Sequence, residues 1–316
     1  MNNMSGRSKK KIPLSICCLT YNHKPFIEKA INSFLTQKTN FSFEVLIHDD
    51  ASTDGTSEIV KAYESKYPSI IKPIYQTENQ WSKGLRSITV NYNFTRAKGK
   101  YIAICEGDDY WTDPHKLQKQ VDFLESHPDY ILCCGGFTSV NGDKKAVHRL
   151  DSVPGVIQSK DQNGFTFELK HTLHQWIIKT LTVVFRNRVG EFNLEKYEHA
   201  RDVHWFYHLL KLGKGYYFKE NFGVYNQHDG GIQSLVKKKE IAETAYNYYE
   251  ELHRLNQDEF TRIMRLKSIA YLVRANHQPY LSRINRQLMK EYGNLVKSPL
   301  EFKWLAAAWV KKHKRN

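Results

Sequence analysis

The chain has 316 residues, of which 41% are hydrophobic and 25% are charged. This composition excludes an intrinsically disordered chain, and no run approaches the roughly 18–20 apolar residues that span a bilayer. The 47 lysines and arginines outnumber the 33 acidic residues, so the formal net charge is +14. Such a balance predicts an anionic partner, whether nucleic acid, an acidic lipid surface or a phosphorylated substrate, without choosing among them.

The N-terminal segment and the cysteines indicate a reducing compartment. Residues 1–11 are polar and basic and lack the apolar h-region of a signal peptide behind them, so we expect a disordered leader rather than a secretion signal. The five cysteines lie in apolar runs and lack the C-x-x-C spacing of zinc or redox sites; they are Cys17, Cys18, Cys105, Cys133 and Cys134. The sequence therefore predicts buried free thiols in a cytoplasmic protein.

The first part of the chain alternates between predicted strands and predicted helices. In chain order these are a strand at 12–19, a helix at 26–35, a strand at 43–47, a helix at 56–67, a strand at 70–75, a helix at 88–97, a strand at 101–105, a helix that begins at Asp113 and Pro114, and a strand at 130–134. This alternation predicts an α/β fold with a mixed, mainly parallel sheet and helices on both faces.

The second part of the chain is less regular. Residues 135–172 are rich in Gly, Asp and Ser and predict an irregular excursion, followed by a strand at 180–185, a helix at 205–212 and one or two short strands at 215–225. From Lys237 the composition becomes helical, with helices expected at 242–255, 260–274 and 280–296. We therefore divide the chain into a leader at 1–11, an α/β domain at 12–236 and a C-terminal helical extension at 237–316.

Polar residues follow three of the predicted parallel strands at the point where each strand ends. They are Thr20, Tyr21 and Asn22 after the first strand, Asp49 and Asp50 after the second, and Glu106, Gly107, Asp108 and Asp109 after the strand at 101–105. Ligands of such sheets bind outside the carboxyl ends of the strands, so we expect these residues to form one site. Clustered carboxylates repel one another and are costly to desolvate, which predicts a hard cation, Mg²⁺ or Mn²⁺, as their partner.

These residues make the chain resemble the family 2 glycosyltransferases of the GT-A fold, over most of residues 12–236. The stretches that carry the likeness are Leu19 to Asn22, Asp49 to Thr56, Glu106 to Trp111, Arg201 with Asp202, and Tyr225 to His228. The resemblance implies a GT-A nucleotide-binding domain of the kind that builds bacterial polysaccharides. It also implies inverting transfer of a sugar from a nucleotide-sugar, with uridine as the expected base, to a hydroxyl of a glycan or lipid-linked acceptor.

The resemblance also implies a role for each matched residue. The nucleotide-sugar would be bound by Thr20, Tyr21, Asn22, Asp50, Glu106, Gly107 and Asp108. A Mn²⁺ or Mg²⁺ ion, bound by Asp108 and His228, would neutralise the departing diphosphate. Asp202 would be the general base that takes the proton of the acceptor hydroxyl. Contacts to the sugar or acceptor are assigned to Asp109, Trp111 and Arg201.

Two positions depart from the family pattern, and several have a plain structural alternative. Glu106 stands at the first acidic position of the D-x-D motif, and Arg201 precedes the expected base where many members carry an acid. Asp202 can instead cap the helix that follows it, and Trp111 can instead be a packing residue. His228 can instead be a surface loop residue without a ligand.

Other functional classes lack their required motifs. A nucleotidyltransferase that makes nucleotide-sugars would need a glycine-rich basic loop after the first strand, but residues 20–24 contain no glycine. A dinucleotide oxidoreductase is disfavoured because no G-x-G-x-x-G follows a strand, and no P-loop is present. A nucleic-acid-binding protein would gather its basic residues with aromatics on one face, whereas here they are scattered along the chain, so no specific nucleic acid partner is expected.

The C-terminal segment allows two interpretations. Residues 299–310 place apolar side chains near helical spacing, and the basic run 311–315 follows. This pattern predicts either an interfacial helix on an anionic membrane or a terminal helix docked on the protein. The first alternative would place a cytoplasmic enzyme peripherally at the inner face of the cytoplasmic membrane.

Overall fold

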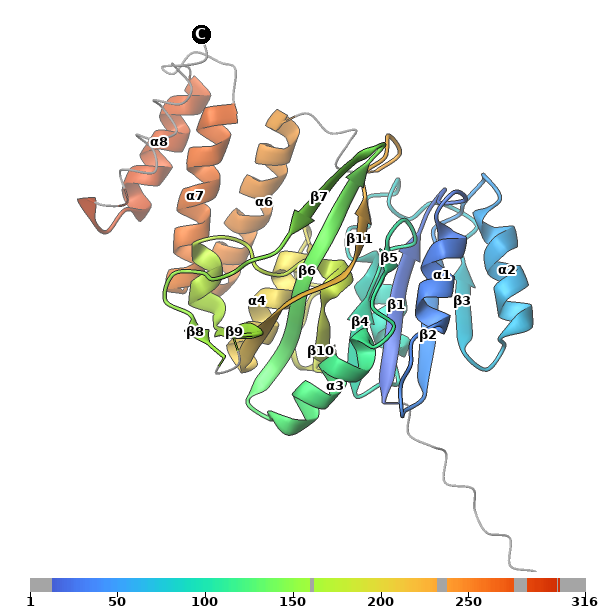
Figure 1. Ribbon diagram of the computed structural model, residues 1–316. Coiled ribbons are helices and arrows are strands. Elements are labelled where there is room, and N and C mark those ends of the chain that lie inside the picture. The colour runs from blue at the N-terminus through green and yellow to red at the C-terminus, as the bar shows by residue number, and fades with distance from the viewer. Residues whose placement is uncertain (1–12, 160–161, 232–237, 276–282, 300, 302–316) are drawn as a thin grey trace, which may run out of the picture. The chain divides into compact units, whose positions relative to one another are not determined.

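The computed structural model describes residues 13–159, 162–231, 238–275, 283–299 and 301 (Figure 1). By its internal contacts the chain forms two compact units. The first unit contains Met1–Leu194 and Trp205–His228, and the second contains Glu195–His204 and Asp229–Asn316. The second unit thus includes two segments that precede the boundary expected at 236/237, Glu195–His204 and the residues from Asp229 to 236, and that boundary stays a prediction.

The first unit is built on an eleven-stranded sheet. Its parallel half has the strand order β3 (Ile71–Tyr75), β2 (Phe43–Asp49), β1 (Leu14–Thr20) and β4 (Tyr101–Ile104). The sheet continues through β10 (Val184–Arg186), β6 (Tyr130–Asn141), β11 (Lys214–Asn226), β9 (Gly164–Phe167) and β8 (Ile157–Gln158), while β5 (Tyr110–Trp111) pairs with β11 and β7 (Lys144–His148) with β6. Because β10 is antiparallel to both of its neighbours, the sheet is mixed, as predicted.

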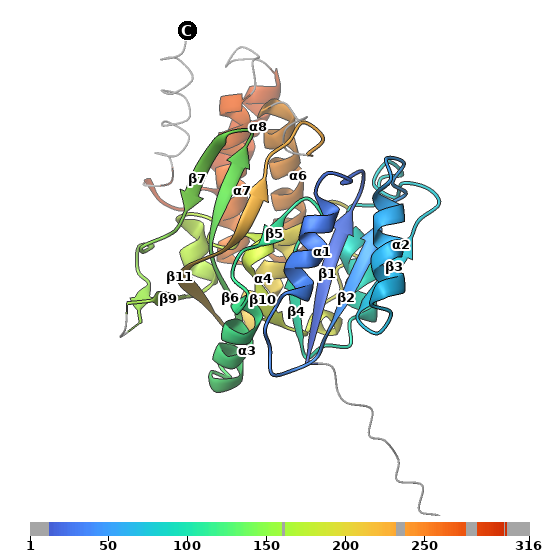
Figure 2. The same ribbon diagram turned by 45° about the vertical axis from the view of Figure 1, so that its right-hand side comes forward.

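Helices pack on both faces of this sheet. Strand β1 is buried along almost its whole length, as expected for a strand covered on both sides. On one face lie α1 (Ile27–Leu35), α2 (Thr56–Lys66) and α3 (Lys116–Ser126), whose apolar side chains join one buried cluster with β1, β2 and β4 (Figures 1 and 2). On the other face Phe94 packs edge-to-face against Phe185 of β10 and Trp205 of α4 (Asp202–Leu212). The predicted α/β fold class is confirmed.

Four local expectations were wrong. The helix expected at 88–97 is a π-helical turn (Thr89–Asn93) followed by a 3₁₀ turn (Phe94–Arg96). Helix α3 begins at Lys116, after an N-cap at His115, whose N–H donates to the Asp113 carboxylate at 2.8 Å. The strand expected at 180–185 is a 3₁₀ turn (Thr180–Thr182) before β10. The excursion expected at 135–172 contains the end of β6 together with β7, β8 and β9, and its exposed strands β7 and β8 lack the apolar runs by which buried strands are recognised.

The second unit is helical. Its long helices are α6 (Lys238–Asn256), α7 (Glu259–Ala275) and α8 (Arg283–Leu295), close to the ranges predicted. They share an apolar cluster that includes Ala242, Leu266, Ile269, Leu288 and Tyr292. Most of the predicted segment 299–310 lies outside the described residues. No helix in the described part of the chain is long and apolar enough to cross a membrane.

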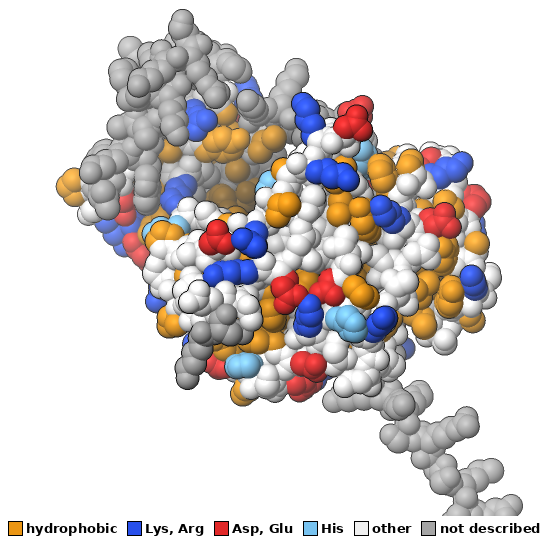
Figure 3. All heavy atoms as spheres, in the orientation of Figure 1, with side chains coloured by type: hydrophobic (Ala, Val, Ile, Leu, Met, Phe, Trp, Pro, Cys, Tyr) orange, Lys and Arg blue, Asp and Glu red, His pale blue; other side chains and the backbone are white. Residues whose placement is uncertain are grey.

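All five cysteines are buried free thiols, as predicted. Figure 3 shows how the basic side chains of the described residues lie on one face of the molecule. On the face of the molecule drawn in Figure 3, Lys and Arg lie among acidic and hydrophobic side chains and form no continuous stripe.

Candidate active site

The carboxyl ends of β1, β2 and β4 bring the three predicted polar stretches together. Thr20, the last residue of β1, is in register with Asp49, the last residue of β2. The N–H of Asp50 donates to the Thr20 carbonyl at 2.9 Å, and the N–H of Gly107 donates to the Leu19 carbonyl at 2.9 Å. The backbone ladder therefore continues past the strand ends and places the loops after β1, β2 and β4 side by side.

The loop after β1 is held by the loop after β2. Asn22 has a positive φ of 53°. Its N–H donates to the Ser52 hydroxyl at 2.9 Å, and its side-chain oxygen accepts from the N–H of Thr53 at 2.8 Å. The N–H of Lys24 donates to the Asp54 carboxylate at 2.9 Å. Asn22 therefore has a structural part in shaping the site, in addition to the nucleotide contact that stays a prediction.

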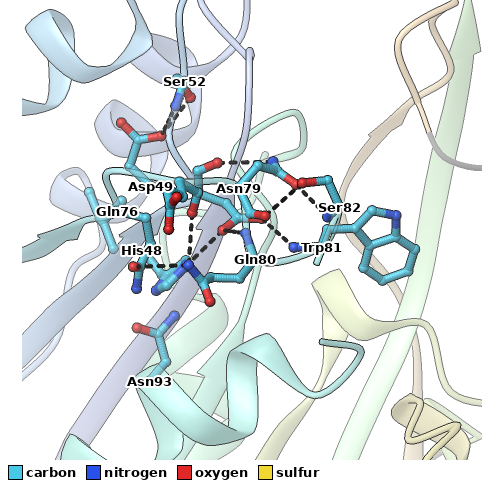
Figure 4. Close-up of polar contacts among 12 residues, drawn as sticks. His48, Asp49, Ser52, Gln76, Asn79, Gln80, Trp81, Ser82 and Asn93 are labelled. Carbon is cyan, nitrogen blue, oxygen red and sulfur yellow. Dashed lines mark hydrogen bonds and ion pairs between the residues drawn. The ribbon is translucent and has the colours of Figure 1, made fainter. Parts of the chain in front are cut away.

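Asp50 fastens the loop after β3 to the site, and the loop residues Asn79, Gln80 and Trp81 that it contacts are labelled in Figure 4. Its two carboxylate oxygens accept from the N–H groups of Gln80 at 2.8 Å and Trp81 at 3.1 Å, and its carbonyl accepts from the Asn79 amide at 3.0 Å. Asp50 is only 2% exposed. The imidazole of His48 lies 3.6 Å from the Asp50 carboxylate, and burial lowers the pKa of His48. The base contact assigned to Asp50 stays a prediction.

Thr20 and Gly107 pack tightly where β1 and β4 end. Thr20 is fully buried, and its hydroxyl has no hydrogen-bond partner among the described residues. A Cβ atom on Gly107 would lie 2.6 Å from that hydroxyl oxygen, closer than such atoms approach. Any side chain at position 107 would therefore displace the end of β1. Tyr21, in contrast, is 43% exposed and leaves its ring open to a ligand.

The acidic residues after β4 occupy different environments. Asp109 is 2% exposed and accepts the N–H of Asn226 at 2.9 Å. Burial raises the pKa of Asp109 well above its usual value, and the negative charges of Asp108 and Glu106 raise it further. Glu106 accepts from the Thr180 hydroxyl at 3.5 Å, and Asp108 is partly exposed. Asp109 thus ties the loop after β4 to β11, while Asp108 faces the histidines described next.

Two histidines converge on Asp108 from separate segments. His228, after β11, places Nε2 at 3.2 Å from the Asp108 carboxylate, and His23, after β1, places Nε2 at 3.8 Å from the same oxygen. The ligand atoms of the three residues lie within 4.8 Å of one another, which suits a single cation. Burial lowers the pKa of His23, although the Asp108 carboxylate opposes this shift. A neutral imidazole can ligate a metal ion.

Trp111 is enclosed and packs against its neighbours. It is 4% exposed, and its indole N–H donates to the Leu181 carbonyl at 2.7 Å. Its ring lies 4.9 Å from that of Phe34, and the Lys116 ammonium lies 4.3 Å from the Trp111 ring centroid. These contacts favour the packing alternative, and a sugar contact of Trp111 stays a prediction.

The sequence did not indicate Lys179. The ammonium of Lys179 lies 3.3 Å from the ring centroid of Tyr225, and its positive charge counteracts the raised pKa of Asp109. The adjacent Thr180 is the donor to Glu106. Lys179 precedes the strand expected at 180–185 and belongs to no motif, so no sequence signal singled it out. His23, in contrast, was recognisable as the next residue after the polar stretch 20–22.

Asp202 and Arg201 belong to the second unit. Asp202 is the first residue of α4, and its carboxylate accepts the N–H of Val203 at 2.9 Å. Burial, together with the nearby charge of Asp202, raises the pKa of Tyr248 on α6 to about 12. The N–H of Arg201 donates to His204 at 3.0 Å. The catalytic role of Asp202 and the acceptor contact of Arg201 stay predictions.

A family model and several curated relatives match this chain. The model described as Glycosyl transferase family 2 matches residues 15–188. The uncharacterized protein Rv1520 of Mycobacterium tuberculosis is 32% identical over 69% of this chain and 60% of its own length. The putative teichuronic acid biosynthesis glycosyltransferase TuaG of Bacillus subtilis is 29% identical over 77% of this chain and 89% of its own length. The chain thus spans about 60% of the mycobacterial relative but most of TuaG.

Solved structures share the fold. The S. aureus TarS 1-349 structure covers 95% of this chain and 88% of its own, with a TM-score of 0.60 and 16% identity. The complex of TarS 1-349 with UDP-GlcNAc covers 94% of this chain and 79% of its own, with a TM-score of 0.57 and 18% identity. At these identities the likeness shows the fold alone.

Proposed function

Because this chain belongs to glycosyl transferase family 2, we propose that it transfers a sugar from a nucleotide-sugar to an acceptor hydroxyl with inversion at the anomeric carbon. The observation that carries the proposal is the meeting of Asp108 and His228, 3.2 Å apart, at the carboxyl edge of the parallel strands. This is where α/β sheets bind nucleotides. Inversion requires one general base and no covalent nucleophile.

The proposed donor is a UDP-sugar. A structure of TarS, which shares the fold, holds UDP-GlcNAc, and the name of a relative from Escherichia coli, WfaP, states UDP-Glc as its donor. The exposed ring of Tyr21 supplies a surface on which a base can stack. The rest of the proposed nucleotide site consists of Thr20, Asn22, Asp50, Glu106, Gly107 and Asp108.

A divalent cation, Mn²⁺ or Mg²⁺, is proposed at Asp108 and His228. The carboxylate and the imidazole fit such an ion because both are metal ligands and both face the same space. When bound, the ion would stabilise the negative charge that develops on the departing nucleoside diphosphate. The residues themselves would hold it at the strand ends, beside the loops that bind the nucleotide.

The general base is proposed to be Asp202. A carboxylate within hydrogen-bond reach of the acceptor hydroxyl removes its proton as the new glycosidic bond forms. The proposed acceptor is a glycan or a lipid-linked glycan, in line with the names of TuaG and WfaP. Cytoplasmic localisation, and membrane contact through the basic C-terminal segment, stay predictions.

The nucleotide site is tested by thermal shift with UDP, GDP and CDP, with and without Mn²⁺. A ligand that binds only the folded state raises its stability by about 2.7 kcal/mol at a hundredfold excess over Kd. We expect UDP to give the largest shift, Mn²⁺ to increase it, and Asp108→Asn to remove the Mn²⁺ effect. Asp143→Asn, at an exposed position between β6 and β7, is the matched control. If no nucleotide shifts the transition while the protein binds nucleic acid firmly, the transferase proposal is wrong.

The general base is tested with Asp202→Asn and the UDP-sugar that gives the largest shift. The amide cannot accept the proton, so we expect kcat to fall by roughly 10²–10⁴-fold. The affinity for UDP, measured by calorimetry, should remain within twofold of wild type. Near-normal transfer by this variant would place the base at another residue.

A further inference from the structure

The three residues around Asp108 come from three different loops of the first unit. Asp108 follows β4, His228 follows β11 and His23 follows β1. The two imidazole rings lie nearly perpendicular, 5.8 Å apart between centroids. His23 lies outside the acidic motif on which the proposed cation site was based, so its place beside Asp108 requires its own explanation.

His23 is held in position by its backbone. Its carbonyl accepts the N–H groups of Phe26 at 2.9 Å and Ile27 at 2.8 Å, at the start of α1. On either side of it, Asn22 and Lys24 are anchored to the loop after β2, as described above. Because these contacts use main-chain atoms of His23, they leave both nitrogens of its ring available.

Neither ring nitrogen of His23 makes a hydrogen bond in the described structure. Nδ1 is buried without a partner, and Nε2 lies 3.8 Å from the Asp108 carboxylate, beyond hydrogen-bond distance. Buried polar groups in folded proteins almost always have a partner. An imidazole that is held in place, makes no hydrogen bond and lies near a carboxylate and a second histidine is therefore suited to a ligand that all three residues share.

Asp108 and His228 are positioned as firmly as His23 is. The side-chain amide of Asn226 donates to the Asp108 carbonyl at 2.5 Å, which ties the loop after β4 to the end of β11. Two residues later, the ring of His228 packs on that of Phe26, 4.6 Å between centroids. Phe26 belongs to the same turn that His23 begins, so this contact links the loops that carry the two histidines.

We propose that His23, Asp108 and His228 form a two-histidine, one-carboxylate site that selects a divalent first-row transition ion over Mg²⁺. The inference rests on the proposed function, in which the ion serves the departing nucleoside diphosphate. Mg²⁺ prefers oxygen ligands and gives up its water reluctantly, whereas imidazole nitrogen favours transition ions. A second imidazole therefore changes which metal the site prefers.

The distances fit a shared ion after a small adjustment. Adjacent ligand atoms that bind one ion at about 2.1 Å lie roughly 3–3.5 Å apart. The distance of 3.2 Å from Asp108 to His228 is within this range, and that of 3.8 Å from Asp108 to His23 is slightly above it. The ligand atoms of His23 and His228 lie within 4.8 Å of each other, so a shared ion would also draw the two rings closer together.

The test measures Mn²⁺ binding to the full chain by electron paramagnetic resonance, without nucleotide. In pulsed experiments, imidazole nitrogens that bind Mn²⁺ produce ¹⁴N couplings whose number reports how many histidines are ligands. We expect couplings from two imidazoles in wild type and from one in His23→Gln and in His228→Gln. Loss of one ligand should weaken Mn²⁺ binding about tenfold or more while changing Mg²⁺ binding little. His174→Gln, at an exposed histidine, is the matched control.

The outcomes separate this proposal from the proposed function. If His23→Gln binds Mn²⁺ with wild-type affinity and retains two imidazole couplings, His23 is not a ligand and the inference is wrong. If wild type binds no Mn²⁺ even at millimolar concentration, the proposed metal site does not exist. The transferase proposal is tested separately, by UDP binding and by sugar transfer. His23→Asn is a second variant of the same position. Like His23→Gln, it retains the backbone carbonyl that accepts the N–H groups at the start of α1.

Discussion

Lys116 shows how costly a single buried charge can be. Its ammonium is fully buried, lies 4.3 Å from the ring centroid of Trp111 and has no hydrogen-bond partner among the described residues. Burial lowers the pKa of Lys116 to about 7, and the surrounding thiols remain neutral because burial raises their pKa, that of Cys133 to about 12. A cation–π contact alone does not replace the water that a lysine loses.

We predict that Lys116→Met stabilises the protein. In the unfolded chain lysine keeps its ordinary pKa near 10.4, so between pH 7 and pH 10 the unfolded state binds more protons and wild-type stability rises with pH. The gain should be roughly 2–4 kcal/mol at pH 7 and shrink toward pH 10, because each pKa unit corresponds to about 1.4 kcal/mol. Denaturant unfolding of wild type and Lys116→Met at several pH values measures this difference in the free energy of unfolding. Lys38→Met, at an exposed position, is the control, and an equal gain in both variants would contradict the prediction.

At the scale of elements, the site depends on loops that are fastened to one another. The loop after β3 has no regular structure, yet the Asp50 carboxylate holds the N–H groups of Gln80 and Trp81 (Figure 4). Arg86 adds a second hold, because its guanidinium donates to the Trp81 carbonyl at 2.8 Å and lies over the Trp81 ring. A buried acceptor with two backbone donors gives this loop a defined place beside β2.

We predict that Asp50→Ala frees this loop without unfolding the sheet. Removing the carboxylate leaves two backbone N–H groups without their acceptor, which costs about 1–3 kcal/mol locally. Amide hydrogen exchange at Gln80 and Trp81 should accelerate at least tenfold, while exchange in β1 and β4 changes little. Glu78→Ala, in the same loop but with an exposed ion pair to Lys83, is the control. Unchanged exchange in Asp50→Ala would show that other contacts hold the loop.

At the scale of the whole molecule, the formal net charge is +14, and on the face drawn in Figure 3 the Lys and Arg side chains of the described residues lie among acidic ones. A positive protein attracts an anionic ligand over a distance of about 10 Å at 0.1 M salt, and added salt screens this attraction. The acidic cluster of the candidate site opposes it at short range. We therefore expect the positive charge to favour the approach of a phosphorylated substrate.

We predict that salt weakens the binding of UDP but not that of uridine. Between 50 and 500 mM NaCl, with Mn²⁺ held constant, the Kd of UDP should rise several-fold, because only the diphosphate carries charge. Isothermal calorimetry measures both ligands, and uridine is the control for effects on the base pocket. Equal salt dependence of the two ligands would mean that the protein's charge does not act on the phosphates.

The sequence by itself determined the parallel half of the sheet and the residues at its carboxyl edge. Buried strands such as β1 and helices such as α1 have strong apolar patterns, because both pack against the core over their whole length. The polar stretches 20–22, 49–50 and 106–109 follow such strands directly. That these stretches meet at one edge of the sheet could therefore be predicted from the alternation of strands and helices along the chain.

Only the tertiary structure decided the strands within 135–172 and the surroundings of Asp108. Strand β7 is exposed along its length and forms because β6 offers it backbone partners, which no apolar pattern records. His23 and Lys179 reach the acidic cluster from distant parts of the chain, since chain folding, not sequence spacing, sets which loops meet. Trp111 and Asp109, which the motif places beside the site, are enclosed. Strand β5, which contains Trp111, pairs with β11, and the Asp109 carboxylate accepts the N–H of Asn226 at the end of β11.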